Sequence, residues 1–491
     1  MIPNNRVYVH LDRNLDYYPS VSVNRTNADS KSGGYASYPA GNAIYEAVRA
    51  CFIGLGLDAT NTGSPRWNPL GEFIQPGMRV LVKPNMVMHT NRGGGGLDCL
   101  VTHPSIIRVM CAYAVKALGG NGTLIIADAP IQSADFNRLR SLMGIDGIAR
   151  QYADRFPGLR VEVRDFRTPP NSCEVASDDV TEFDIGDRSE LEGAGGRRFR
   201  CADYPTSRMA LCHGQGTHKY YVPSVVLDSD VVLNLPKLKT HAYAGMTAAL
   251  KNFIGVCATK DNLPHFSRGS LAEGGDEYLT PDLRCQLRGD LADDFADRKM
   301  TPGVAWASVP RLAVFGALMR IARASGCSKN GRGEAPFNDT IWRTILDVYR
   351  IARTGLPGGK LGLTHRTIFT MVDAVIAGEG NGPLRPDPAP LGLLLAGTDP
   401  YAVDLVAAHI GGFNIEQLRY LTSFPSDLTT VTPDSVRVCS NQSRWDGRPI
   451  LDCCSNISLR PANGWSQPHR QTAAAKEIPS NACSDSQNAL R

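Results

Sequence analysis

The sequence lacks the cysteine spacings that hold metals. It contains 13 cysteines in 491 residues, yet no C-x-x-C occurs, and Cys453 and Cys454 are adjacent. Zinc and iron–sulfur sites draw their cysteines from short, regular spacings. We therefore expect neither an iron–sulfur cluster nor a structural zinc in this chain. Single cysteines in apolar segments, such as Cys111 and Cys257, are expected to be buried and reduced.

An excess of charge of either sign is also missing. The chain carries 52 lysines and arginines against 48 aspartates and glutamates, which gives a net charge of +4. No dense run of basic residues stands out. This balance lacks the electrostatic signature of nucleic-acid-binding proteins, so nucleic acid is not an expected partner.

No segment has the length and apolar character of a membrane span. The first residues carry too many polar and charged groups for a signal peptide. The most apolar helical segment, residues 309–324, is interrupted by Arg311, Arg320 and Arg323 and is shorter than the roughly 20 residues that a span needs. We expect a cytoplasmic protein in which 309–324 is an amphipathic helix.

The familiar catalytic motifs are absent as well. The sequence contains no G-x-S-x-G, no Walker A motif, no H-E-x-x-H and no glycine-rich dinucleotide turn between a strand and a helix. These absences exclude serine hydrolases of the nucleophile-elbow type, P-loop enzymes, zincins and Rossmann oxidoreductases.

The other predicted elements are arranged around one stretch near the middle of the chain. Residues 231–235 form a short apolar run, typical of a strand buried on both faces of a parallel sheet. Lys237, Lys239 and His241 follow at spacing two, so in an extended segment they point the same way. A helix is expected from about Ala242, with its first N–H groups facing the same space. Together these features predict an anion site.

Similar apolar runs recur along the chain and alternate with amphipathic helices. The predicted strands are 79–83, 123–127, 159–163, 231–235, 367–375 and 391–396. This alternation predicts an α/β fold with a doubly wound, mainly parallel sheet and helices on both faces. Two irregular insertions, 166–218 and 259–336, interrupt it; long insertions are often lids or binding loops.

The predicted core gives the chain four parts. Residues 1–74 form an N-terminal arm with a helix, and 75–415 form the α/β domain. Residues 416–459 are a C-terminal extension. Residues 460–491 are polar, with few large apolar groups, which predicts a disordered tail.

Several segments, in order, resemble a known family. They are LVKPNMV (81–87), THPSIIRVM (102–110), NLPKLKTH with ALKNFIG (234–255), NDTIWRTILDVYRI (338–351), GEGNGP (378–383) and DPYAVD (399–404). Over about residues 79–412 the chain resembles the domain-of-unknown-function 362 (DUF362) family. The resemblance implies no particular reaction, because the family as a whole has no single established one. Some relatives carry an appended ferredoxin-like cysteine cluster, which is missing here.

The carboxyl ends of parallel strands meet at one edge of a sheet, where α/β proteins bind ligands. We therefore expect one site from the groups that follow strands 79–83 and 231–235. The expected reacting groups are Lys239, His241 and Lys83, since a lysine whose pKa is lowered by neighbouring cations can act as a base or Schiff-base former. The expected substrate-binding residues are Asn85, Asn234, Lys237, Thr240, Lys251, Asn252 and His265.

Acidic residues supply a possible metal site. If Asp373, Glu379 and Asp404 lie against the basic groups, their oxygens would suit magnesium bridging a phosphorylated or carboxylated substrate. An ordinary network of ion pairs has the same composition. Lys251 has an alternative role too, because a lysine in the last turn of a helix interacts favourably with the helix dipole.

These residues predict an enzyme that acts on a small anionic metabolite in a biosynthetic pathway. A ligand-binding or accessory protein without chemistry would use the same pocket. A redox protein, related to the iron–sulfur-bearing relatives, is the third alternative, although the cluster ligands are missing from this sequence.

Overall fold

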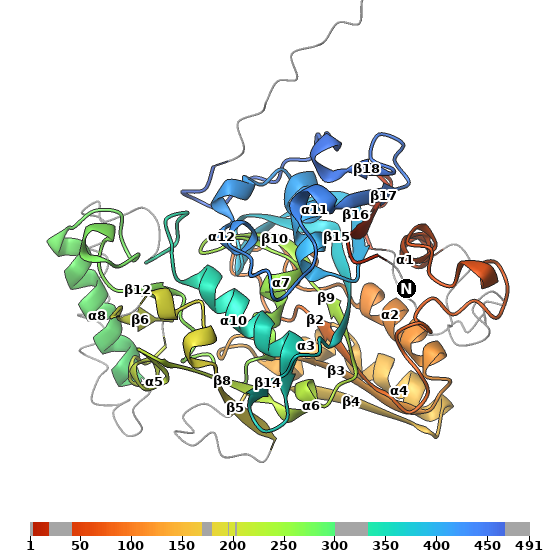
Figure 1. Cartoon of the computed structure of the whole chain (residues 1–491), viewed down its shortest axis with the longest axis horizontal. Helices are drawn as coiled ribbons and strands as arrows, with labels where there is room; N and C mark the ends of the chain where they lie inside the picture. The colour runs from red at the N-terminus through yellow and green to blue at the C-terminus, as the bar shows by residue number, and fades with distance from the viewer. Residues whose placement is uncertain are drawn as a thin grey trace, which may run out of the picture.

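The computed structural model describes residues 3–18, 42–168, 179–194, 196–201, 204–299 and 332–466. A large central sheet dominates it (Figure 1). Its strands are β1 (Arg6–Leu11), β2 (Arg79–Pro84), β3 (Gly122–Asp128), β4 (Leu159–Asp165), β9 (Val231–Leu235), β10 (Lys237–His241), β11 (Gly245–Thr247), β15 (Thr367–Asn381), β16 (Arg385–Gly397), β17 (Arg437–Ser440) and β18 (Arg448–Pro449).

The strand order is β18-β17-β1-β16-β15-β9-β2-β3-β4, with β10 and β11 attached to β15. The run from β15 through β9, β2 and β3 to β4 is parallel throughout. The pairs β15–β16 and β1–β16 are antiparallel. The predicted α/β fold with a mainly parallel sheet is therefore confirmed.

Strand β9 lies in the middle of the parallel part, between β2 and β15. All five of its residues are buried. Successive side chains point to opposite faces, so Val232 packs in one hydrophobic core while Val231 and Leu233 pack in the other. A continuous apolar run is what a strand covered on both faces requires.

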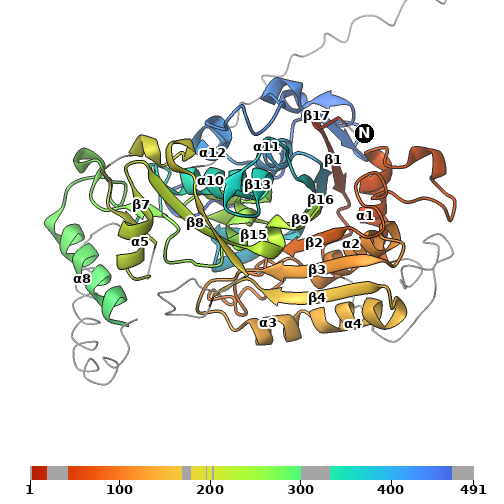
Figure 2. The same ribbon diagram turned by 60° about the horizontal axis from the view of Figure 1, so that its bottom comes forward.

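Helices cover the two faces of the sheet and pack in these two cores. Figure 2 shows α3 and α4 on one side of the sheet and α10 and α11 on the other. One core contains α1 (Ala43–Gly54), α2 (Pro104–Ala117), α3 (Phe136–Leu142) and α4 (Ile145–Arg155). The other contains α7 (Ala249–Asn252), α10 (Ile341–Thr354), α11 (Pro400–Gly411) and α12 (Arg419–Thr422).

Local sequence signals set the ends of the longer helices. Asp399 caps α11 by accepting hydrogen bonds from the backbone N–H groups of Tyr401 and Ala402, with Pro400 at the first helical position. Gly412, at φ 73°, ends the same helix in the left-handed conformation that glycine tolerates. Asp399 is therefore a structural cap.

The first insertion, 166–218, leaves the central sheet. Its strand β5 (Val180–Asp184) pairs antiparallel with β8 (Thr217–Pro223) in a separate three-stranded sheet. The short apolar alternation around 181–185 corresponds to β5.

The second insertion, 259–336, contacts the first. Strand β12 (Phe266–Ser267) pairs antiparallel with β6 (Phe199–Arg200). These strands and α8 (Leu283–Lys299) lie on the opposite side of the molecule from α1 and α2 (Figure 1). The amphipathic helix predicted at 309–324 falls outside the described residues.

Both ends of the chain contribute to the central sheet. Strand β1 pairs with β16 and, in parallel, with β17, so the sheet extends beyond residues 75–415 at both ends. The start of the predicted tail also docks on the core, because Trp465 Nε1 donates a hydrogen bond to Ala242 O at 2.7 Å. The order thus continues to residue 466, and 467–491 fall outside the described ranges.

Most described cysteines are reduced, as expected. Nine are free of disulfides, and Cys111 and Cys257 are among the buried ones. Cys285 differs from the expectation, because it is disulfide-bonded.

None of the helices in the described ranges combines sufficient length with sufficient apolar character to cross a bilayer.

Candidate functional site

The residues after β9 form a strand where the sequence predicted the approach to a helix. Strand β10 runs parallel to β15 and folds back on β11. The turn is closed by His241, whose Nδ1 accepts hydrogen bonds from the backbone N–H groups of Tyr243 at 3.0 Å and Ala244 at 3.2 Å. The predicted helix start at Ala242 is wrong, because pairing with β15 and β11 satisfies this backbone instead.

The helix that follows has no open N-terminus. Helix α7 begins at Ala249, and Asp404 of α11 accepts hydrogen bonds from the N–H groups of Ala249 at 2.6 Å and Leu250 at 2.9 Å. Burial raises the pKa of Asp404 to about 7. A carboxylate of the protein thus occupies the position that the sequence assigned to an anionic ligand, so that part of the prediction is also wrong.

Lys83 is held in a buried ion pair. Its Nζ lies 2.7 Å from Asp128 Oδ1, and both side chains are nearly inaccessible. The other carboxylate oxygen, Asp128 Oδ2, accepts a hydrogen bond from Met86 N at 2.6 Å. Lys83, predicted as a reacting group, is therefore neutralised by the protein.

The ion pair of Lys83 and Asp128 leaves no space for a side chain at Gly255. A Cβ atom there would lie 2.0 Å from Asp128 Oδ1 and 2.6 Å from Lys83 Nζ. Gly255→Ala is expected to lower the free energy of unfolding by about 1–3 kcal/mol, the usual range for overpacking, in urea denaturation. Gly147→Ala is the control, because a Cβ in that α4 position meets no atom within 4 Å and should stabilise the helix by about 0.5–1 kcal/mol. Equal effects of the two substitutions would contradict the steric explanation.

Lys237 is likewise paired inside the protein. Its Nζ lies 2.8 Å from Asp373 Oδ2, and neither side chain is exposed. The Tyr18 hydroxyl donates to Asp373 Oδ1 at 2.5 Å and accepts from Lys237 Nζ at 2.7 Å. The backbone N–H of His103 donates to Asp373 Oδ2 at 2.8 Å. Three donors from distant parts of the chain therefore bind the carboxylate of Asp373.

The three acids proposed as metal ligands have separate partners. Asp373 binds Lys237, Glu379 binds Arg460, which donates its backbone N–H at 2.9 Å, and Asp404 caps α7. In the described ranges, no group of three or more histidine, cysteine, aspartate or glutamate side chains is placed to hold a metal ion. The structure does not bring these three carboxylates together.

Three predicted asparagines do meet. Asn252 Nδ2 donates to Asn234 Oδ1 at 2.8 Å and to Lys83 O at 3.2 Å, while its Oδ1 accepts from Asn85 Nδ2 at 3.3 Å. Asn85 Oδ1 in turn accepts from Lys239 Nζ at 2.8 Å. The asparagines thus connect the ends of β2 and β9 and orient Lys239. Thr240 has a different role, since its hydroxyl donates to Gly380 O at 2.7 Å.

Lys239 is buried, and its amine has no acidic partner among the described residues. In the part of the chain that the structure describes, its Nζ donates to Asn85 Oδ1 and to Leu100 O at 2.5 Å, and the side chain is inaccessible. Burial, together with the positive charge of Lys237, lowers the pKa of Lys239 to about 7. Near neutral pH the amine and the ammonium are therefore both populated.

Lys251 has still fewer partners. It is 7% exposed and lies in the last turn of α7, but its ammonium group makes no hydrogen bond or ion pair with any residue in the described ranges. Lys260 lies nearby and donates to Ile254 O at 2.9 Å. Burial lowers the pKa of both lysines to about 8, and the charge of Lys260 contributes at Lys251.

Two histidines complete the group. Burial lowers the pKa of His241 well below its ordinary value, and the charges of Lys251, His265 and Lys239 lower it further. Burial, followed by the charge of Lys251, lowers the pKa of His265 to about 3. Both imidazoles are therefore neutral at neutral pH. Because His241 Nδ1 accepts two hydrogen bonds, its proton is on Nε2.

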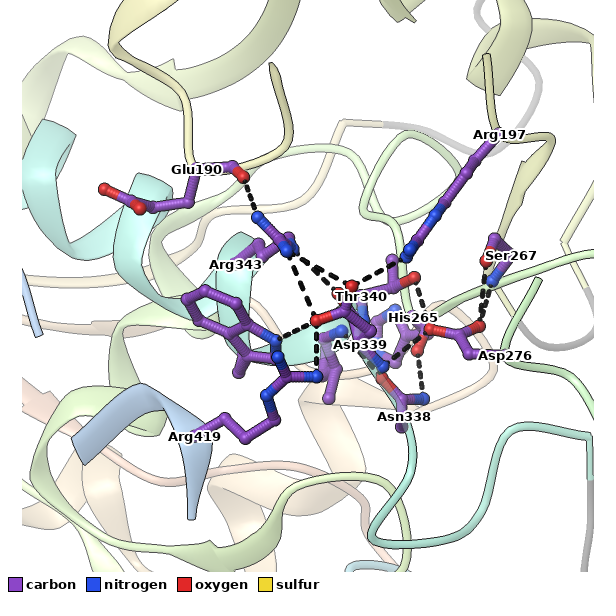
Figure 3. A network of polar contacts seen from close by, with 12 residues as sticks. Glu190, Arg197, His265, Ser267, Asp276, Asn338, Asp339, Thr340, Arg343 and Arg419 are labelled. Atoms are coloured by element: carbon purple, nitrogen blue, oxygen red, sulfur yellow. Dashed lines mark hydrogen bonds and ion pairs between the residues drawn. The ribbon is translucent and has the colours of Figure 1, made fainter. Parts of the chain in front are cut away.

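A polar network holds the segment that carries His265 (Figure 3). Asn338 Nδ2 donates to His265 O at 2.8 Å. The carboxylate of Asp276 accepts from Ser267 N at 2.5 Å and from the Thr340 hydroxyl at 2.6 Å. The segment preceding α10, which supplied one of the resembling motifs, thus fixes the backbone on both sides of Phe266.

We use the name basic cluster for Lys239, His241, Lys251, Lys260 and His265. Lys239, His241, Lys251 and Lys260 are buried and His265 is half-buried, and none of the five forms an ion pair with a carboxylate in the described ranges. Four of the five were predicted. Lys260 was missed, because it belongs to an irregular segment with no periodic pattern.

Comparison with known proteins supports the sequence resemblance. A family model described as "Domain of unknown function (DUF362)" matches residues 183–409. The resemblance to DUF362 is confirmed. The matched DUF362 region includes all five residues of the basic cluster, whereas the resembling segments at 81–87 and 102–110 precede it.

A relative among curated proteins, from Synechocystis sp., is described as a thylakoid-associated protein. It is 28% identical over 186 residues, which is 38% of this chain and 41% of the relative. The chain therefore spans less than half the length of that relative. No solved structure matches the chain.

Proposed function

We propose that the basic cluster binds a small anionic metabolite, phosphorylated or carboxylated, and that the protein is an enzyme acting on it in a biosynthetic pathway. The observation that supports this is Lys251, which is only 7% exposed and whose ammonium group has no partner in the described ranges. Lys239 adds a second buried amine whose partners are both uncharged. A buried cation without a counter-ion costs several kcal/mol, and an anionic ligand would offset that cost.

The groups of the basic cluster can be assigned separately to anion binding and to proton transfer. Lys251 and Lys260 supply charge for the anion. General acid–base catalysis is most effective when the pKa lies near the working pH, and the pKa of Lys239, about 7, meets this condition. His241 offers its Nε2–H as a hydrogen-bond donor. We assign Lys239 as the base and His241 as the group that orients the substrate.

Inorganic phosphate is expected to raise the melting temperature of the wild type. At a concentration 100 times the Kd the gain is about 2.7 kcal/mol. Lys251→Met should abolish the shift, and the shift should be smaller at pH 9 than at pH 6.5, because Lys251 and Lys260, with pKa values of about 8, lose their protons. Differential scanning fluorimetry measures both effects.

The matched control for this experiment is Lys360→Met. Lys360 is an exposed lysine in β14 (Lys360–Leu361), so the substitution changes the net charge equally while leaving the cluster intact. It should retain the full phosphate shift. A shift that survives in the Lys239→Met/Lys251→Met double variant would place the anion site elsewhere.

In this proposal, magnesium binds to the site together with a phosphorylated substrate that already coordinates it. The carboxylates of Asp373, Glu379 and Asp404 already have protein partners, so the substrate would supply much of the coordination. Repeating the phosphate titration with magnesium and with a chelator tests this part.

A carrier or accessory protein would bind the same anion without changing it. Native mass spectrometry of gently purified protein gives the mass of a retained anion. Incubation with that compound then separates the two functions, because an enzyme releases a product of different mass and a carrier releases the compound unchanged. The cytoplasmic location remains a prediction, and so does the absence of a nucleic-acid partner, which the balanced charge of the chain supports.

A further inference from the structure

One cysteine lies against the basic cluster. Cys201 directly follows β6, is buried and is not in a disulfide. Its Sγ lies 3.2 Å from His265 Nδ1, which is also 2.7 Å from Leu263 O. Because a carbonyl oxygen only accepts, Nδ1 must carry the proton. The sulfur is therefore placed to accept from the same N–H, as a thiolate would.

Two lysines of the described ranges face this sulfur. Burial lowers the pKa of Lys251 and of Lys260, and a negative charge on Cys201 raises both again, so the two ammonium groups lie close enough to attract a thiolate. The Tyr204 hydroxyl faces it too and accepts a hydrogen bond from Gln132 N at 3.0 Å.

One described carboxylate near Tyr204 is already paired. Asp261 influences Tyr204 electrostatically, and it forms an ion pair with Arg208 Nε at 3.3 Å. Among the described residues, the surroundings of Cys201 thus include an imidazole N–H, two lysines and an acid that is paired with an arginine. An electropositive setting of this kind favours the thiolate form of cysteine.

Cys257 provides a comparison within the same region. It lies near Lys260 and Lys83, yet burial raises its pKa to about 12 in spite of both charges. What distinguishes Cys201 is the His265 N–H at its sulfur and the unpaired ammonium of Lys251. Proximity to lysines alone does not ionise a buried thiol.

We propose that Cys201 is an ionised, nucleophilic thiol of the anion site. This inference rests on the proposed function, because the lysines that would bind the anion also stabilise the thiolate. A nucleophilic thiol at this site limits the expected class of substrates to anions that carry an electrophilic carbonyl. Sγ forms a bond to the carbonyl carbon, the π-electron pair moves onto the oxygen, and the Lys251 ammonium gives that oxygen a proton. The addition needs no further reactant.

Thiolate absorbance at 240 nm tests the ionisation without requiring access to the buried sulfur. The difference between wild type and Cys201→Ser, measured on the full-length protein, should titrate at least one pH unit below the value of about 8.5 for an ordinary cysteine. Cys257→Ser is the control and should give no difference between pH 6 and 8. A Cys201 titration at or above 8.5 would overturn the proposal.

Iodoacetamide tests the nucleophilicity. The sulfur displaces iodide and forms a carbon–sulfur bond, and peptide mass spectrometry follows the rate at each cysteine. The exposed Cys454 is the internal reference for an accessible thiol. Lys251→Met should shift the pH profile of Cys201 labelling upward by about one unit, a tenfold loss of thiolate below its midpoint, and leave Cys454 unchanged. An unaltered Cys201 profile would contradict stabilisation by Lys251.

The phosphate experiment separates this inference from the proposed function. Cys201→Ser keeps the lysines and should still be stabilised by phosphate. Phosphate should also raise the midpoint of the Cys201 titration in the wild type, because it competes for the same cations. If phosphate raises the melting temperature but Cys201 shows no thiolate titration, the anion site is supported and the ionised thiol is wrong. If Cys201 titrates as a thiolate but phosphate has no effect, the ionised thiol is supported and the anion site is wrong.

Discussion

Replacement of Asp373 by alanine is expected to lower the free energy of unfolding by about 3–5 kcal/mol, the usual cost of breaking a buried ion pair from one side. The substitution leaves Lys237 buried without its counter-ion. It also removes the acceptor of the Tyr18 hydroxyl and of the His103 backbone N–H. Urea denaturation at neutral pH, without added metal, measures the change.

Glu379→Ala is the control on the same strand. The partner of Glu379 is Arg460, whose side chain is 53% exposed, and an ion pair in contact with solvent contributes about 1 kcal/mol or less. The control should therefore be nearly neutral. If Asp373→Ala were harmless without metal and harmful only when magnesium is present, Asp373 would be a metal ligand and the structural explanation would be wrong.

The parallel half of the sheet could be predicted from the sequence. Strands β2, β3 and β9 are covered on both faces, so each reads as a continuous apolar run that needs no information about its neighbours. The pairing of β1 with β16 and β17 was not predicted. It joins the two ends of the chain, and such pairing depends on the rest of the fold.

The difference between local sequence and long-range pairing also explains why the helix predicted after β9 was wrong. Small residues such as Ala242 and Ala244 favour a helix locally, but β10 gains hydrogen bonds from β15 and β11, which the local sequence cannot show. From the sequence, Lys237 was also predicted to be free to bind a ligand. The parallel register places Asp373 beside it, so the partner comes from a strand much further along the chain.

The candidate site shows where local patterns suffice and where they do not. The asparagines and Lys239 were predicted because they follow strands whose ends meet at one edge, and the structure joins them. Cys201 was missed. It meets His265 only because β6 of one insertion pairs with β12 of the other, and neither insertion has a periodic pattern.

The stability of the protein is expected to rise between pH 7 and 9, and Lys239 should account for a defined part of the rise. Burial, helped by the charge of Lys237, lowers the pKa of Lys239 from its ordinary 10.5 to about 7 in the folded protein. Below pH 7 both states bind the proton, and the cost of the buried charge is fully present. Between pH 7 and 10.5 the unfolded chain binds a proton that the folded protein lacks, so the free energy of unfolding increases with pH. Over pH 7–9 this amounts to about 2 kcal/mol.

Lys239→Met keeps the length of the side chain and removes the amine, so the variant should lose this part of the pH dependence. Its stability at a single pH is less informative, because Asn85 Oδ1 and Leu100 O also lose their donor, at about 1–3 kcal/mol for each acceptor left unpaired. Urea denaturation at pH 7, 8 and 9 gives the slope, with the exposed-lysine variant Lys360→Met as the control that should follow the wild type. If Lys239→Met and the wild type gain the same stability between pH 7 and 9, the amine holds its proton equally in the folded and unfolded states. Lys239 would then be unsuited to act as a base at neutral pH, and the catalytic part of the proposed function would fail.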